Sequence, residues 1–304
     1  MSDKQSQPIS NVKDIGSVLM DFLARVESPI EPHLKADPSG AIEGRVREEA
    51  QSWAVTGPRF EKHLRTGVDM STIVYYQNSI DAQVDIACYT TLLLTIDDFN
   101  IPVSAMEEFT TRLLIGAPQL HPSLEYLVGL LRRMTNYFPI AAEQNIATST
   151  LNFIHRTLFD VEQADSVLSK NAGRYVVWAR LKDGIGEAYA FFIWERTKFP
   201  ATAPYAQTIP DIDFVLGHIN DLFSFYKEEL AGEYNNSICR RAQVMQLTIG
   251  EALAGVAEEV LQGIGRVRAN LTGEEKETWE RFLSKYLTFH CLAPRYRLSE
   301  IITF

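Results

Sequence analysis

The chain has 304 residues, of which 46% are hydrophobic and 22% are charged, a balance typical of a soluble globular protein with a sizeable core. Its formal net charge of −10 argues against nucleic-acid binding, because phosphate backbones require a basic protein surface. The three cysteines, Cys88, Cys239 and Cys291, lie too far apart for a metal motif and are expected to be reduced core thiols.

The N-terminal segment is polar and lacks the apolar core of a signal peptide. We expect residues 1–12 to be disordered and residues 13–304 to form one domain. The sequence contains no apolar run long enough to span a bilayer. These features predict a cytoplasmic protein that does not bind membranes.

Helical hydrophobic periodicity recurs along most of the remaining chain, and alternating strand patterns are few. Gly57-Pro58 and residues 200–210 are predicted to interrupt the helices. The end of one helix, residues 91–96, is almost wholly apolar, which is typical of a buried helix. The sequence therefore predicts a single all-α bundle. Its expected helices cover residues 15–25, 41–55, 71–98, 103–114, 123–136, 141–163, 173–194, 211–230, 248–271 and 273–296.

One predicted helix carries the sequence N-D-L-F-S-F-Y-K-E over residues 220–228. Successive helical residues are rotated by about 100°, so Asn220, Ser224 and Glu228 share one stripe. An amide, a hydroxyl and a carboxylate oxygen form a ligand set suited to Mg²⁺. Lys227 lies on the same stripe, where an ammonium is understandable if diphosphate also binds. This helix also carries the apolar or aromatic residues Leu222, Phe223, Phe225 and Tyr226, which argues against a merely solvated face.

This nine-residue segment matches the N-D-x-x-S-x-x-K-E motif of class I terpene cyclases and particularly resembles trichodiene synthase and its fungal relatives. The resemblance extends from about residue 40 to the end of the chain. It implies a helical bundle with a central active-site cavity, farnesyl diphosphate as the substrate and three Mg²⁺ ions as cofactors. It also implies a homodimer and assigns Lys227 to diphosphate binding.

The expected acidic partner of this motif is Asp97-Asp98 at the end of the apolar helix, followed by Asn100. Two adjacent carboxylates are costly to bury without cations, and a metal site explains them. The family motif is often D-D-x-x-D, whereas Ile101 stands here at the last position. The resemblance assigns Asp97 to the metal. It leaves Asp98 and Asn100 as metal ligands or as residues that support the ligands.

Two further segments resemble the diphosphate-binding parts of these cyclases. Arg180 offers a fork of donors suited to phosphate, and Asp183 lies within reach of it three residues later. Gly184 weakens the helix at this point, and the resemblance makes Asp183 and Gly184 the linker and effector of diphosphate sensing. Near the C-terminus, the pair Arg295-Tyr296 resembles the pair that hydrogen-bonds diphosphate in trichodiene synthase.

The implied reaction releases diphosphate and leaves an allylic carbocation in a dry, aromatic-lined cavity. Aromatic faces stabilise such cations. Tyr75, Tyr89, Phe191 and Phe289 are the candidate lining residues, and Phe289 is expected on the same helix as Arg295.

Two alternatives remain open at this point. An isoprenyl diphosphate chain-elongating synthase shares the helical scaffold and the metal-diphosphate chemistry, although it normally carries two Asp-rich motifs. The second alternative is a degenerate homologue that binds prenyl diphosphate without turnover. Only the shortened acidic motif supports this alternative.

Overall fold

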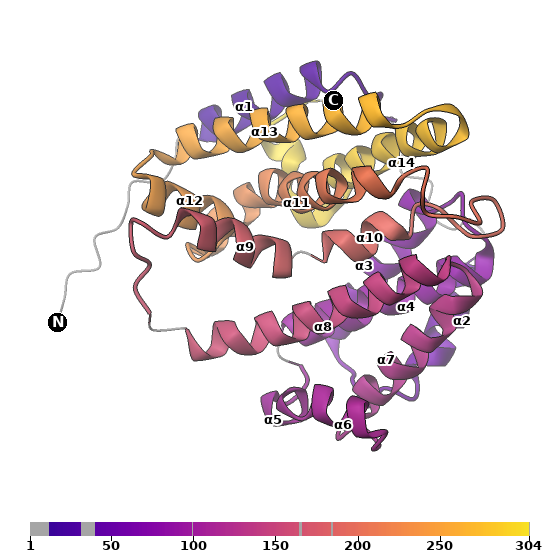
Figure 1. Ribbon diagram of the computed structural model, residues 1–304. Coiled ribbons are helices and arrows are strands. Elements are labelled where there is room, and N and C mark those ends of the chain that lie inside the picture. Colours follow the sequence, from indigo (N-terminus) through magenta and orange to yellow (C-terminus); the bar gives the residue numbers. More distant parts are fainter. Residues whose placement is uncertain (1–11, 32–39, 99, 164–165, 184, 304) are drawn as a thin grey trace.

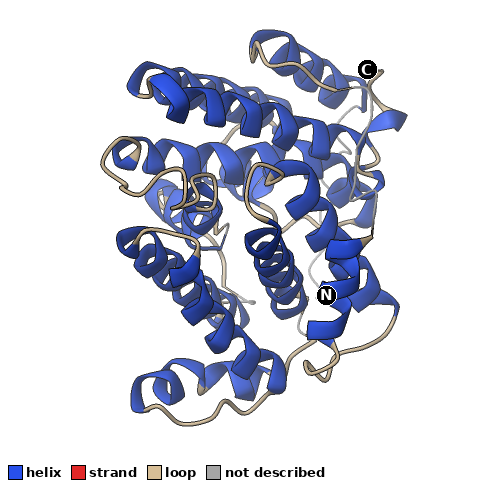
Figure 2. Cartoon of the chain, turned by 90° about the vertical axis from the view of Figure 1, so that its right-hand side faces the viewer, coloured by secondary structure: helices blue, strands red, loops and turns tan. Residues whose placement is uncertain are grey.

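The computed structural model describes residues 12–31, 40–98, 100–163, 166–183 and 185–303, and every regular element in these ranges is a helix (Figure 2). The predicted all-α class is therefore confirmed. None of the described helices is both long and apolar enough to cross a bilayer. The α-helices are α1 Val12–Arg25, α2 Ala41–Ala50, α3 Pro58–Asp69, α4 Ile80–Asp97, α5 Val103–Glu107, α6 Phe109–Ile115, α7 Pro122–Arg133, α8 Ile140–Glu162, α9 Gly173–Asp183, α10 Gly186–Phe191, α11 Ile209–Ala231, α12 Ser237–Met245, α13 Ile249–Asn270 and α14 Gly273–Leu292.

Helix α11 occupies the middle of the bundle (Figure 1). It packs against α10 on one side and α13 on the other, and it also contacts α1, α9, α12 and α14. Helix α4 packs against α3 and α2, and its residues from Ala82 to Leu93 are all buried. The expectation of a buried helix before Asp97 is therefore confirmed. These two helices carry the motifs that the sequence singled out, and both are held on several sides.

Two helices were missing from the sequence prediction. Helix α3 begins directly after Gly57, with Pro58 in its first turn, and buries Phe60, Leu64 and Val68. Proline is well tolerated at that position, and the apolar spacing of four residues is helical, so both signals were readable. Helix α12 begins directly after Asn236, whose side chain accepts a hydrogen bond from the backbone N–H of Cys239.

The prediction of one continuous helix over residues 71–98 is wrong, because the helix is interrupted before Ile80. A π-helical turn covers Met70–Val74, and α4 starts after Ser79, whose side chain accepts from the N–H of Ala82. The Ser79 N–H donates to the Glu195 carboxylate at 2.6 Å. A residue distant in sequence therefore completes this helix start, and local propensity does not reveal such a partner.

Two other predicted helices are also divided. Residues 173–194 form α9 and α10, with Ile185 between them at φ 52°, a left-handed conformation unusual for a β-branched residue. Residues 103–114 form the short helices α5 and α6. At the C-terminus, α14 ends at Leu292 and a separate 3₁₀ turn covers Pro294–Tyr296, so Phe289 and Arg295 do not share a helix. Residues 1–11 and Gly184 lie outside the described residues, and Val12 already belongs to α1.

Candidate active site

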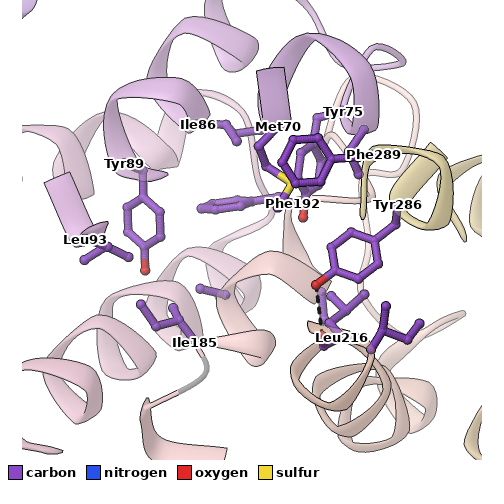
Figure 3. Close-up of a cluster of buried hydrophobic side chains, with 14 of the residues drawn as sticks. Met70, Tyr75, Ile86, Tyr89, Leu93, Ile185, Phe192, Leu216, Tyr286 and Phe289 are labelled. Atoms are coloured by element: carbon purple, nitrogen blue, oxygen red, sulfur yellow. Dashed lines mark hydrogen bonds between the residues drawn. The ribbon is translucent and has the colours of Figure 1, made fainter. Parts of the chain in front are cut away.

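A cavity of about 1810 Å³ opens between α3, α4, α8, α9, α10, α11, α12 and α14. Its lining side chains are of two kinds. Charged and amide side chains come from α4, α9, α11 and the C-terminal turn among other elements, and aromatic and aliphatic side chains make up much of the rest. Figure 3 shows a cluster of buried hydrophobic side chains that includes four of the lining residues, Met70, Leu216, Tyr286 and Phe289, which come from three different elements.

The polar stripe of α11 lies at this cavity. Asn220, Lys227 and Glu228 are lining residues, whereas Ser224, which lies between them along the helix and is 3% exposed, is not. The Lys227 Nζ lies 3.2 Å from Glu228 Oε1. The ammonium therefore neutralises part of the carboxylate charge within the site itself.

The Asn220 amide is held from the side of α14 and the C-terminal turn. Its Nδ2 donates to the Tyr296 hydroxyl at 3.2 Å and lies 3.4 Å from Nε2 of His290. Burial lowers the pKa of His290 to about 3, although its hydrogen bond to the Tyr286 carbonyl opposes that shift. The imidazole is therefore neutral. His290 has no signal in the sequence, because nothing in its spacing connects it to a motif on α11.

Asp97 and Asp98 are adjacent in the chain but have different surroundings. Asp97 lines the cavity, and its side chain remains accessible to water there. Desolvation by the surrounding protein, followed by the charges of Asp98 and Asp183, raises the pKa of Asp97 to about 6. Asp98 instead accepts from His63, whose Nε2 lies 2.8 Å from its Oδ2.

Asn100 is not a lining residue, and its buried Nδ2 has no hydrogen-bond partner among the residues that the structure describes. Asp98 has a second basic neighbour, Arg59, at 3.8 Å. Of the three polar residues predicted at the end of α4, Asp97 and Asp98 line the cavity and Asn100 does not.

Arg180 on α9 is fixed by three acceptors. Its Nε donates to Asp221 Oδ2 at 2.8 Å, one terminal nitrogen donates to Asp183 at 3.1 Å, and the other donates to the Gly217 carbonyl at 2.6 Å. The predicted contact between Arg180 and Asp183 is present. Asp221 was overlooked as a site residue although it is the second letter of the N-D-x-x-S-x-x-K-E motif. Desolvation raises the pKa of Asp183, and the charge of Arg180 opposes that rise.

Arg295 and Tyr296 lie in the 3₁₀ turn that follows α14, and both line the cavity. The Arg295 guanidinium carbon is 5.3 Å from the centroid of the Tyr296 ring. Tyr296 is 2% exposed, and its hydroxyl accepts from Asn220. The structure therefore brings these two segments, 76 residues apart, into direct contact.

The apolar wall differs from the prediction. Phe289 lines the cavity, but Tyr75, Tyr89 and Phe191 do not. Tyr75 and Tyr89 pack behind Tyr189, with ring centroids 6.4 Å and 6.1 Å from it. Hydrogen bonds hold these hydroxyls within the protein, from Tyr75 to the Tyr189 carbonyl and between Tyr89 and Thr150. Besides Phe289, the aromatic lining is provided by Phe153, Tyr189, Tyr234, Tyr286 and Tyr296.

Within the described ranges, no group of three or more His, Cys, Asp or Glu side chains is placed to hold a metal. The oxygen-bearing stripe on α11 contains one carboxylate, one amide and one hydroxyl, and Asp97 belongs to another helix. A metal held here would therefore use mixed oxygen ligands and complete its shell with other oxygens, as Mg²⁺ commonly does.

The chain is similar to several terpene synthases. The sequence model of the trichodiene synthase (TRI5) family matches residues 45–303. Terpene synthase 29 of Postia placenta is 34% identical over 92% of this chain and 82% of its own length. Monoterpene synthase 25 of the same fungus is 31% identical over 98% of this chain and 89% of its own length.

The fold is shared with a solved bacterial structure, the linalool/nerolidol synthase of Streptomyces clavuligerus in complex with 2-fluorogeranyl diphosphate. The TM-score is 0.64 at 16% identity, with 89% of this chain and 99% of that chain covered. The all-helical fold, the cavity and the family match over residues 45–303 agree with one another, and the chain belongs to the trichodiene synthase family and is a terpene cyclase.

Proposed function

We propose that this terpene cyclase is a Mg²⁺-dependent sesquiterpene synthase that ionises farnesyl diphosphate and cyclises the resulting cation. The observation that carries the proposal is the meeting of three separate segments at one cavity. Asn220 on α11 contacts Tyr296 of the C-terminal turn, Arg180 contacts Asp221 on α11, and all four residues line the cavity.

The polar lining of the cavity suits a diphosphate group. Arg180, Lys227 and Arg295 provide positive charge, and the Tyr296 hydroxyl provides a further donor. When the C–O bond of the substrate breaks, its electron pair stays with the diphosphate oxygen. Fixed donors stabilise the negative charge that develops on this leaving group. The positions of Arg180 and Tyr296 are already set by hydrogen bonds to α11.

The donor set fits Mg²⁺. Asn220, Ser224 and Glu228 would hold the ion from α11, and Asp97 would hold it from α4; three ions in total are proposed on the family resemblance. Bound Mg²⁺ would neutralise the charge of the diphosphate. In this proposal Lys227 leaves Glu228 and pairs with the diphosphate, and Asp98 remains with His63 as a supporting residue.

The apolar lining suits a carbocation. Phe153, Tyr189, Tyr286 and Phe289 contribute aromatic rings to the cavity wall, and the faces of such rings attract cations. The Tyr286 hydroxyl donates to the Leu216 carbonyl at 2.9 Å, and the Tyr189 hydroxyl donates to Thr90 at 3.0 Å. The final cation loses a proton or captures water, which gives a hydrocarbon or an alcohol.

The test is to incubate the purified protein with Mg²⁺ and, separately, geranyl, farnesyl and geranylgeranyl diphosphate, and to analyse products by gas chromatography–mass spectrometry. We expect cyclic C15 products from farnesyl diphosphate and none after chelation of the metal. Because one relative is named a monoterpene synthase, the geranyl arm is informative. Turnover of geranyl diphosphate alone would contradict the proposed chain length.

A parallel reaction containing isopentenyl diphosphate separates cyclisation from chain elongation. Longer prenyl diphosphates in that reaction would contradict the proposal. Tight binding of substrate without any terpenoid product or diphosphate release would identify a non-catalytic binder. The homodimer proposed on the family resemblance is tested by light scattering coupled to size-exclusion chromatography, where a monomer mass would reject it.

A further inference from the structure

His290 lies on α14 with its ring turned toward α11 and is 0% exposed. The ring is packed between aromatic neighbours, with centroids 4.3 Å from Tyr286 and 4.8 Å from Tyr296. His290 is not among the residues that line the cavity. It therefore cannot touch a bound substrate, and any effect on the reaction passes through its neighbours.

The hydrogen bonds of the imidazole determine where its proton lies. Nδ1 is 2.8 Å from the carbonyl oxygen of Tyr286, which can only accept, so Nδ1 must carry the hydrogen. A neutral ring then leaves a lone pair on Nε2. The Asn220 amide lies 3.4 Å from this nitrogen, and only its NH₂ end can donate to it.

The same NH₂ group donates to the Tyr296 hydroxyl at 3.2 Å. The two N–H bonds of the Asn220 amide therefore both point toward α14 and the turn that follows it. Turning the amide over would place its oxygen against the Nε2 lone pair and remove both donations. The arrangement leaves Oδ1 of Asn220 for a ligand, and it leaves the Tyr296 hydroxyl hydrogen available because that oxygen acts as the acceptor.

We infer that His290 is a positioning residue that fixes the orientation of the Asn220 amide, so that Oδ1 is presented to Mg²⁺ and the Tyr296 hydroxyl remains a donor to diphosphate. This inference rests on the proposed metal site. It adds a residue outside the sequence motifs, and it assigns His290 the role of a neutral hydrogen-bond acceptor.

The test compares His290→Phe, which removes the acceptor, with His290→Gln, whose side-chain oxygen can accept near the former Nε2. Binding of Mn²⁺ as a probe, with inorganic diphosphate present, is measured by electron paramagnetic resonance. We expect about 10-fold weaker binding in the Phe variant, the usual effect of losing a group that orients a metal ligand. The Gln variant should bind within about 3-fold of the wild type on the same principle.

His218 provides a matched control. It is 3% exposed on α11, its Nδ1 lies 2.8 Å from the carbonyl of Phe214 four residues earlier, and it does not line the cavity. His218→Phe should leave Mn²⁺ binding unchanged. A folded His290→Phe variant that binds Mn²⁺ like the wild type would overturn the inference. A wild type that binds no Mn²⁺ with diphosphate would overturn the metal site itself, and the positioning role with it.

A second measurement covers the case in which His290→Phe does not fold. Histidine ¹⁵N resonances of the wild-type protein, assigned with the Gln variant, report which ring nitrogen carries hydrogen. We expect hydrogen on Nδ1 of His290. Hydrogen on Nε2 would contradict the inference, because that nitrogen could not then accept from Asn220.

Discussion

Arg180 on α9 and Asp221 on α11 are joined by a 2.8 Å ion pair, with only 13% and 11% of their side chains exposed. The same guanidinium contacts Asp183 and the Gly217 carbonyl. One side chain therefore ties α9 to α11 beside the proposed diphosphate site, and its planar fork matches three acceptors at fixed angles.

The first prediction concerns Arg180→Lys. A single ammonium cannot satisfy Asp221, Asp183 and a carbonyl together, so the charge will no longer be held in place. We expect kcat/KM to fall by about 100-fold, the usual loss for a fixed donor to developing negative charge. Steady-state kinetics of diphosphate release measure this. The control is Arg266→Lys, at an exposed pair with Asp211, where an unchanged rate is expected. Equal effects at both positions would contradict the assignment.

The second prediction concerns Glu228→Gln. The amide removes the only carboxylate of the α11 stripe and leaves Lys227 without its partner at 3.2 Å. We expect the Mg²⁺ concentration for half-maximal activity to rise by about 10-fold or more, since anionic oxygens dominate Mg²⁺ affinity. A metal titration of initial rates provides the measurement. The control is Glu162→Gln, which makes the same charge change at an exposed position and should leave the Mg²⁺ titration curve unchanged.

The third prediction separates the cavity wall from the core. Phe289→Ala and Phe109→Ala each remove a buried phenyl ring, 1% and 0% exposed, and each should destabilise the protein by about 3 kcal/mol. Only Phe289 lines the cavity. We therefore expect an altered product distribution for Phe289→Ala and an unchanged one for Phe109→Ala. Urea unfolding and product analysis test both halves, and an identical product profile for all three proteins would refute the assignment of Phe289.

The fourth prediction concerns the junction of α9 and α10. A Cβ on Gly186 would lie 2.4 Å from Asp213 Oδ1 and 2.5 Å from its carbonyl oxygen, which is too close. We expect Gly186→Ala to lower the free energy of unfolding by about 1–3 kcal/mol through this overlap. Gly265→Ala on α13 meets nothing within 4 Å and should raise it by about 0.5–1 kcal/mol. Stabilisation by both substitutions would show that α10 does not depend on this close approach.

The fifth prediction is a pH dependence. Desolvation, followed by the charge of Glu187, raises the pKa of Asp213 from 3.8 to about 7. Between these values the folded protein holds a proton that the unfolded chain has lost. Stability therefore falls as pH rises through this window. Denaturant unfolding from pH 5 to pH 8 should show a decline that is smaller in Asp213→Asn. Parallel curves for the two proteins would contradict the raised pKa.

Residues that are near each other on one helix were the most predictable part of the site. Asn220, Lys227 and Glu228 line the cavity because helical periodicity puts them on one face, although Ser224 on the same stripe does not line it. The break before α4 was not predictable, since it is completed by Glu195, which is 116 residues from Ser79. The prediction of the aromatic lining residues failed for a similar reason. Whether Tyr75 or Tyr189 faces the cavity depends on which ring packs in front, and neighbouring helices decide that.

The same limit applies to His290. Its residue type and position are compatible with an ordinary buried histidine, and only the contact with Asn220 gives it a further role. Asp221, by contrast, was readable within the motif. Its partner Arg180, 41 residues earlier, had already been identified as a diphosphate residue.

Helix α14 presents Phe289 to the cavity and, one residue later, His290 to Asn220. Adjacent side chains on a rigid helix turn together when the helix rolls about its axis. A substitution elsewhere that rolls α14 and so reshapes the apolar lining of the cavity would also rotate His290 away from Asn220. Variants that make a different carbon skeleton through such a roll should therefore need a different Mg²⁺ concentration for half-maximal activity. Variants that only shorten the Phe289 side chain should not.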